Sequence, residues 1–166
     1  MNQAWLDGAG RRIRVRIAEF KVAKGNAVLV AIGLGSCIGV AIYDPEHRVG
    51  GMAHILLPGK GGENDNPNKF SESSIDAMIS QIYDLGGSLI SLKAKIVGGA
   101  NMFSWIGDGK KTIGERNIEA ARDKLKRSNI PIEAEEIGGN EGRSVEFHVG
   151  SGQLLIRNAR GEEHTI

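Results

Sequence analysis

Residues 38–57 constrain the fold of this chain more than any other stretch. β-Branched and aromatic residues recur at every second position of Ile38–Tyr43, an apolar run returns in Val49–Leu57, and Asp44-Pro45-Glu46 lies between them. Alternation with period two is typical of a strand, and proline beside acidic residues is typical of a turn. The stretch therefore predicts a β-hairpin with its two strands side by side.

This hairpin joins the two residues with the strongest chemical signal. Cys37, the single cysteine of the chain, precedes the first strand in Gly33-Leu34-Gly35-Ser36-Cys37-Ile38-Gly39, and His54 lies near the end of the second strand. The start of one hairpin strand faces the end of the other, so we expect Cys37 and His54 to approach each other. A thiol with a nearby base on a glycine turn indicates a nucleophile. The alternative is a buried inert cysteine and a core histidine.

The residues around Cys37 argue against a dinucleotide-binding fingerprint and against the nucleophile elbow of hydrolases. A dinucleotide fingerprint beginning at Gly33 would need a third glycine where Ile38 stands, followed by a helix, and a strand is expected instead. The nucleophile elbow of hydrolases also requires a helix after the turn. The glycines do allow backbone N–H groups at Gly35 and Ser36 to approach a substrate carbonyl, so we expect an oxyanion site there.

The remaining elements are predicted from periodicity and capping residues. Ser73 with Asp76 indicates a capped helix whose apolar stripe ends at Gly86-Gly87, and Thr112 with Glu115 indicates a second helix reaching about Ser128. Further strands are expected over Ile13–Val22, Ala27–Ile32, Leu92–Val97, Pro131–Ile137, Val145–Val149 and Leu154–Ile156.

These elements predict a single α/β (α+β) domain over residues 1–166, with loose ends over 1–11 and 159–166. Hairpins dominate, so a mixed, mainly antiparallel sheet with packed helices, an α/β sandwich, fits best. Residues 58–68 are polar and glycine-rich, which indicates a surface loop beside the end of the His54 strand.

Charge and composition exclude several functional classes. Lys and Arg total 21 against 20 Asp and Glu, which gives no electrostatic basis for a nucleic-acid partner or for an anionic membrane. The cluster Arg11, Arg12, Arg14 and Arg16 is interpreted as the solvated side of a strand. No apolar run approaches the length of a membrane span, and the N-terminus lacks the pattern of a secretory signal. A lone cysteine then suits the cytoplasm.

No cofactor or metal is expected. His47 falls in a turn, and His148 lies on a late strand without a second ligand nearby. No Cys/His set has the spacing of a zinc site. Met102, Phe103 and Trp105 are either exposed anchors for a partner or part of the core.

Several motifs taken together resemble the CheD family, the chemoreceptor glutamine deamidases of bacterial and archaeal chemotaxis. The similarity runs from about residue 13 to 157, and the motifs stand in the family's order. They are Gly33-Leu34-Gly35-Ser36-Cys37, Gly50-Gly51-Met52-Ala53-His54-Ile55-Leu56-Leu57-Pro58, Ile96-Val97-Gly98-Gly99-Ala100-Asn101-Met102-Phe103, Ile113-Gly114-x-Arg116-Asn117 and Gly138-Gly139-Asn140-x-Gly142-Arg143.

The resemblance implies a single-domain α/β sandwich like that of the deamidase toxins. It implies hydrolysis of glutamine side chains on the cytoplasmic helices of methyl-accepting chemoreceptors, with Cys37 as nucleophile and His54 as general base. A side activity on glutamyl methyl esters and a partnership with the phosphatase CheC are implied as well.

One position departs from the family pattern. The family carries a threonine six residues before the cysteine, where this chain has Ala31. A backbone carbonyl at or near Ala31 is then expected to orient His54 in place of the hydroxyl. The alternative is a catalytically weak or inactive module that binds receptor or CheC.

Overall fold

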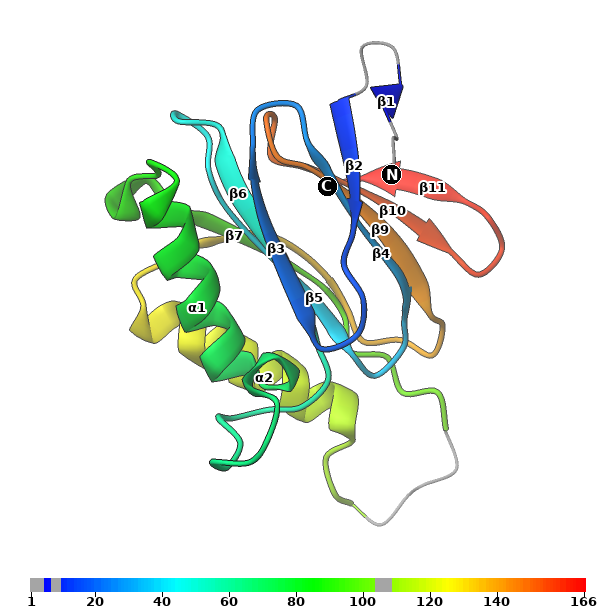
Figure 1. Ribbon diagram of the computed structural model, residues 1–166. Coiled ribbons are helices and arrows are strands. Elements are labelled where there is room, and N and C mark those ends of the chain that lie inside the picture. Colours follow the sequence, from blue (N-terminus) through cyan, green and yellow to red (C-terminus); the bar gives the residue numbers. More distant parts are fainter. Residues whose placement is uncertain (1–4, 7–9, 104–108) are drawn as a thin grey trace.

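The predicted central hairpin forms, and both of its strands are buried along their whole length. Its strands are β5 (Ile38–Asp44) and β6 (Val49–Ile55). A strand that is buried on both faces needs a packed layer on each side. In the computed structural model, which describes residues 5–6, 10–103 and 109–166, these layers are a second sheet on one side and two helices on the other (Figure 1).

The described strands form two sheets. The hairpin sheet has the order β3 (Glu19–Lys24), β6, β5, β7 (Lys93–Gly98) and β8 (Ile132–Ile137). The covering sheet has the order β1 (Trp5–Leu6), β2 (Gly10–Arg14), β4 (Val28–Leu34), β9 (Arg143–His148), β10 (Gln153–Asn158) and β11 (Glu163–Thr165). Most neighbours are antiparallel; β2·β4 and β7·β8 are parallel.

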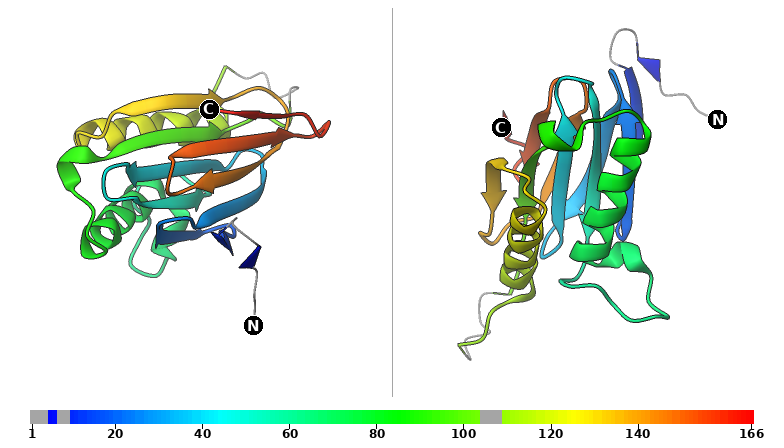
Figure 2. Two further views of the ribbon diagram at one scale, coloured as in Figure 1. Left: turned by 90° about the horizontal axis from the view of Figure 1, so that it is seen from above. Right: turned by 90° about the vertical axis from the view of Figure 1, so that its left-hand side faces the viewer.

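Helices α1 (Ser71–Asp84) and α2 (Ile113–Arg127) lie on the same outer side of the hairpin sheet (Figure 2). Short 3₁₀ turns, η1 (Pro67–Lys69) and η2 (Leu89–Ser91), flank α1. Neither described helix is long and apolar enough to cross a membrane.

Alternation along the hairpin divides its side chains between two cores. Ile38, Val40 and Ile42 of β5 pack with the helices, in a cluster that also contains Ile75, Met78, Ile82, Ile118, Ala121 and Leu125. Cys37, Ala41 and Tyr43 pack toward the covering sheet, in a cluster that also contains Leu29, Ala31, Leu34, Met52, Phe147 and Leu154. The fold class expected from the sequence is confirmed, with two sheets in place of the one that was expected.

The single strand predicted over residues 13–22 is wrong. The chain makes β2, bends at Ala18, whose φ is +60°, and continues as β3 in the other sheet. The Glu19 carboxylate accepts a hydrogen bond from the Arg16 N–H at 3.0 Å and closes the bend. The apolar residues stand at odd positions before the bend (Ile13, Val15 and Ile17) and at even positions after it (Phe20 and Val22), and this change of phase is the sequence signal of the bend.

The two helix starts differ from each other. Thr112 and Glu115 form the reciprocal capping box predicted for α2. The predicted cap of α1 is wrong, because the helix begins at Ser71 after Phe70, which makes no side-chain cap. The Ser73 hydroxyl instead donates to the Pro67 carbonyl at 2.8 Å, which ties η1 to the first turn.

The C-terminal residues expected to be loose are ordered by pairing. Strand β11 pairs with β10, and the Lys95 ammonium, largely buried, donates to the Ile166 carbonyl at 2.9 Å. At the other end of the chain, β1 and β2 pair within the stretch that was also expected to be loose. Of the four arginines, Arg12 is half-buried and its guanidinium pairs with Glu146, while the other three are exposed.

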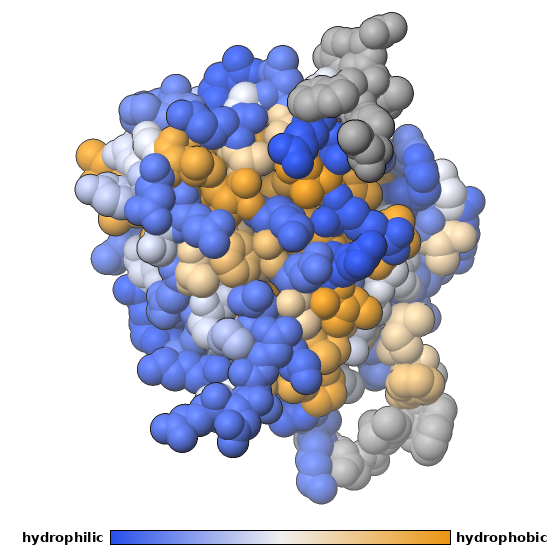
Figure 3. Space-filling view, viewed as in Figure 1, coloured by the Kyte–Doolittle hydropathy of each residue, from blue (hydrophilic) through white to orange (hydrophobic). Residues whose placement is uncertain are grey.

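Apolar residues gather over the strands in the middle of the face seen in Figure 3, and the loop after β6 at the lower left is polar, as expected.

Replacing Gly51 by alanine should lower the free energy of unfolding by about 1–3 kcal/mol, the usual cost of overpacking a core. An added Cβ would lie 2.8 Å from Met78 of α1 and 2.9 Å from the Lys21 carbonyl. Urea unfolding measures the change. Gly62→Ala is the control, because its nearest neighbour is a loop carboxylate at 3.4 Å. Equal stability of the two variants would contradict tight packing of α1 on β6.

Candidate active site

The turn that carries Cys37 joins the two sheets. Strand β4 ends at Leu34 in the covering sheet, and β5 begins at Ile38 in the hairpin sheet. Near its end β4 contains a bulge between Ala31 and Leu34, where Gly33 has a φ of +73° that favours glycine. The candidate nucleophile therefore lies where the chain crosses between layers, and this turn between β4 and β5 is at the lower end of the sheets in Figure 1.

All three carbonyls of this turn are anchored to other parts of the fold. The Gly35 carbonyl accepts from Ala100 N at 2.8 Å, and the Cys37 carbonyl accepts from Gly99 N at 2.9 Å. The Ser36 carbonyl accepts from Asn117 Nδ2 at 2.9 Å. Among the described residues no hydrogen-bond acceptor faces the N–H groups of Gly35, Ser36 or Cys37. These three N–H groups therefore remain available as hydrogen-bond donors.

Gly98 and Gly99 allow this close approach of the β7 end to the turn. A Cβ on Gly98 would lie 2.5 Å from the Cys37 carbonyl oxygen, and the φ of Gly98 is +105°. Only glycine fits there without displacing the backbone of Cys37.

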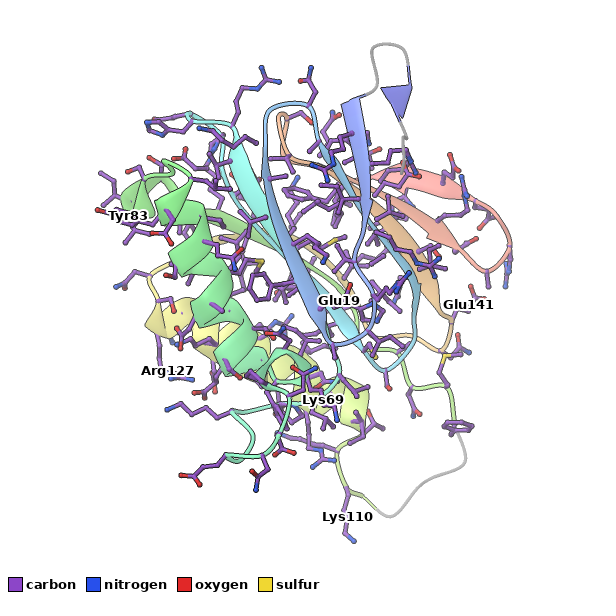
Figure 4. All side chains as sticks on the ribbon, viewed as in Figure 1. Glu19, Lys69, Tyr83, Lys110, Arg127 and Glu141 are labelled. Atoms are coloured by element: carbon purple, nitrogen blue, oxygen red, sulfur yellow. The ribbon has the colours of Figure 1, made fainter. Side chains whose placement is uncertain are left out.

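Cys37 and His54 lie on the same face of the hairpin sheet. His54 pairs with Gly39 across β5·β6, and Cys37 is two residues before Gly39. Diagonal neighbours of this kind have Cα atoms about 7–8 Å apart, within reach of longer side chains. Gly39 has no side chain of its own, and the Leu34 side chain packs over it, with Cδ1 3.1 Å from the position that a Cβ of Gly39 would take. Glu19, labelled in Figure 4, pairs with His54 from the other side and marks this end of β3.

Burial shifts the pKa values of Cys37 and His54 in opposite directions, because it favours the neutral form of each group. It raises the pKa of the Cys37 thiol, an effect partly offset by the residue's own N–H, which favours the thiolate. It lowers the pKa of the His54 imidazole, which is 1% exposed. Both groups are therefore neutral near pH 7, a resting state suited to a thiol and a general base.

The His54 ring is not held by a hydrogen bond from any described residue. Neither Nδ1 nor Nε2 has a partner. The Val15 backbone acts on the ring by favouring its charged form, but less strongly than burial opposes it. The hydrogen bond expected from a backbone carbonyl at or near Ala31 to the His54 ring is therefore absent among the described residues, and the backbone that affects the pKa of His54 is that of Val15. The chain between β2 and β3 passes the ring there, which the sequence did not indicate.

His54 also borders a cavity of about 330 Å³. Its walls are Arg14, Val15, Arg16, Ile17 and Ile32, and the two isoleucines are 56% and 51% exposed. This cavity is open to a ligand from the edge where β2 meets β3.

A second cavity, of about 360 Å³, adjoins the other side of the turn at Ser36. Met102, Phe103, Ile113 and Arg116 are among the residues that line it. Met102 and Phe103 are 50% and 63% exposed, so they are surface residues and not part of the core. Trp105, considered with them, lies outside the described residues.

Asn117 is the site residue that reasoning from the residues alone missed. It is fully buried on α2, and its Nδ2 donates both to the Ser36 carbonyl and to the Leu56 carbonyl, at 2.9 and 3.1 Å. The available signal was its place on the apolar stripe of α2, between Gly114 and Ala121. A polar residue in such a stripe calls for a buried partner.

A cluster of potential metal ligands lies at the opposite end of the hairpin. Oxygen and nitrogen atoms of Asp44, Glu46 and His47 lie within 4.8 Å of one another. The Asp44 carboxylate already accepts from the N–H groups of Glu46, His47 and Ser88, which lower its pKa against the effect of burial. The cluster therefore works as a turn cap.

A family model described as "CheD chemotactic sensory transduction" matches residues 56–158. The protein named chemoreceptor glutamine deamidase CheD from Thermotoga maritima is 41% identical over 149 residues, which cover 90% of this chain and 93% of that protein. The chain belongs to the CheD family.

Other CheD relatives match over similar lengths. The probable chemoreceptor glutamine deamidase CheD of Archaeoglobus fulgidus is 42% identical and covers 93% of this chain and 98% of its own. That of Desulforamulus reducens is 46% identical over 87% and 89%. The family-model match includes Asn117 and begins two residues after His54.

Among solved structures, the hypothetical protein YfiH of Bacillus licheniformis is 16% identical with a TM-score of 0.48, over 72% of this chain and 51% of that one. This likeness is too distant to support a functional statement.

Acid should destabilise the protein through His54. Its folded pKa lies below the ordinary 6.5, so as pH falls below about 6.5 the unfolded chain takes up a proton that the folded chain does not. Stability is therefore lost toward acid. Urea unfolding at pH 7.5 and 5.5 should show a smaller loss in His54→Gln than in the unmodified protein. An identical loss would mean that His54 is not buried as a neutral ring.

Proposed function

We propose that this CheD protein is a cysteine-dependent deamidase that converts chemoreceptor glutamines to glutamate. Two observations carry the proposal. Cys37 and His54 lie on the same face of the hairpin sheet, and the N–H groups of the Cys37 turn have no hydrogen-bond acceptor among the described residues. The names of the relatives supply the substrate class, because they are chemoreceptor glutamine deamidases.

In the first half of the reaction, the neutral His54 takes the Cys37 proton as the sulfur attacks the side-chain carbonyl carbon of glutamine. A carbon–sulfur bond forms, and the carbonyl oxygen becomes an oxyanion. The N–H groups of Gly35, Ser36 and Cys37 supply donors for it, and one such donor contributes about 3–4 kcal/mol in other enzymes. Burial raises the thiol pKa, so proton transfer to His54 has to accompany the attack.

In the second half, the protonated His54 gives its proton to the leaving nitrogen, the carbon–nitrogen bond breaks, and ammonia departs. A thioester with Cys37 remains. Water attacks the thioester as His54 accepts its proton, and glutamate and the free thiol are released. The residues of this chain supply every proton transfer in the scheme.

His54 works here without a side-chain partner, as a dyad with Cys37. The unpaired ring nitrogens leave the ring free to turn toward the sulfur or toward the leaving group. The Val15 backbone favours the charged form of the ring, which supports its role as the proton acceptor. We infer that activity is retained but lower than with a hydroxyl at position 31.

The proposed setting is the cytoplasm, where the receptor's signalling helices lie. The same thioester chemistry applies to glutamyl methyl esters, with methanol as the leaving group, so a side activity on these esters is part of the proposal. CheC is the proposed protein partner, and exposed Met102 and Phe103 offer it an apolar contact next to the turn.

The second candidate is a receptor- or CheC-binding module without catalysis. Ala31 favours it, because a buried alanine cannot orient His54 through a side chain. The N–H groups of the turn, which have no acceptor among the described residues, favour the enzyme, because a scaffold has no need for them.

Cys37→Ala and Cys37→Ser should abolish deamidation of a receptor fragment while leaving the fold intact, because no other residue of the chain offers a thiol. His54→Gln should reduce it by about 10²–10⁴-fold, the usual contribution of a general base. Mass spectrometry follows the conversion of amide to acid. His47→Gln, at the other end of the hairpin, is the control and should keep full activity. Activity in Cys37→Ala would exclude the mechanism.

Ala31→Thr should raise the deamidation rate about fivefold, the factor given by one hydrogen bond of about 1 kcal/mol to His54. Ala31→Val has the same shape without the hydroxyl and should give no increase. The same mass assay measures both. An inactive unmodified protein beside an active Ala31→Thr variant would exclude the two-residue dyad and favour the binding module.

A further inference from the structure

One side chain of α2 contacts both halves of the candidate site. Asn117 Nδ2 donates to the carbonyl of Ser36, the residue before Cys37, at 2.9 Å. The same nitrogen donates to the carbonyl of Leu56, two residues after His54, at 3.1 Å. Asn117 is fully buried, so both hydrogen bonds are shielded from water.

The orientation of this amide follows from its partners. A reversed amide would place Oδ1 against two carbonyl oxygens, which cannot donate to it. The observed orientation leaves Oδ1 buried without a partner among the described residues. An unpaired buried oxygen is unfavourable, and an apolar side chain would avoid it. Docking of α2 does not require the amide, because Ile118, Ala121 and Leu125 already pack the helix on the sheet.

The hydrogen bond to Ser36 determines where the Cys37 N–H points. No described peptide bond is cis, and in a trans peptide the carbonyl and the following N–H point in opposite directions. With the Ser36 carbonyl held toward α2, the Cys37 N–H is directed away from the helix. The peptides on either side are held by Ala100 N and Gly99 N. The peptide that carries the nucleophile's own N–H is held by Asn117.

We propose that Asn117 is a positioning residue of the reaction. Through Ser36 it holds the Cys37 N–H in the orientation that binds the oxyanion. Through Leu56 it fixes the end of the His54 strand relative to that turn. Asn117 itself does not touch the substrate. This inference rests on the proposed deamidase function and adds a residue to that site.

Steady-state kinetics on a receptor fragment test the role. Asn117→Asp keeps the shape and removes both donors, and Asn117→Ala carries the same test if the charged variant does not fold. We expect kcat to fall about 10–100-fold with KM changed less than twofold, because the loss of a well-placed oxyanion donor acts on the transition state. Leu125→Ala, in the same helix and fully buried, is the control for lost stability and should keep kcat within about threefold.

Alkylation of Cys37 by iodoacetamide across pH is the second measurement, and it requires no glutamine substrate. The midpoint of the rate should move upward in the Asn117 variants, because the Cys37 N–H is no longer held beside its sulfur, and should not move in Leu125→Ala. Asn117 variants that match Leu125→Ala in both kcat and midpoint would overturn the inference and leave the deamidase proposal intact. If the unmodified protein does not deamidate, a midpoint shift confined to the Asn117 variants would still support positioning by Asn117.

Discussion

The hydrogen-bonded register between β5 and β6 is the constraint on which the rest of this structure depends. Both strands are buried on both faces, so a slip of one residue would exchange the side chains of two cores at once. The register that satisfies both cores also pairs His54 with Gly39 and sets Cys37 diagonally beside it. The packing of two apolar layers therefore determines the relative placement of thiol and imidazole.

The same burial determines the electrostatic state of the pair. A group in an apolar surrounding favours its neutral form, so the thiol holds its proton and the imidazole does not take one. A resting ion pair is thus disfavoured, and in the proposed reaction charge separates only when the thiol attacks the substrate. In the proposed reaction the N–H groups of Gly35, Ser36 and Cys37 bind that charge, while the carbonyls of the same turn accept hydrogen bonds from Ala100, Asn117 and Gly99.

Local patterns predicted the elements well and their assignment to layers poorly. The hairpin, the capping box of α2 and the apolar stripe of α1 follow from residues within one or two turns of each other. The assignment of β2 and β3, on either side of the bend at Ala18, to different sheets does not, since it depends on which strands each of them meets. The ordered C-terminus depends on Lys95, which lies 71 residues from Ile166 in the chain.

By itself, the sequence determined that Cys37 and His54 would lie on adjacent strands, because a short hairpin leaves few alternative pairings. Only the tertiary structure decided what surrounds them. Asn117 lies 81 residues from Ser36 and 61 from Leu56 along the chain. The Val15 backbone, which acts on His54, belongs to the segment that joins β2 of the covering sheet to β3 of the hairpin sheet. Contacts of that span arise from the packing of layers, which no local periodicity encodes.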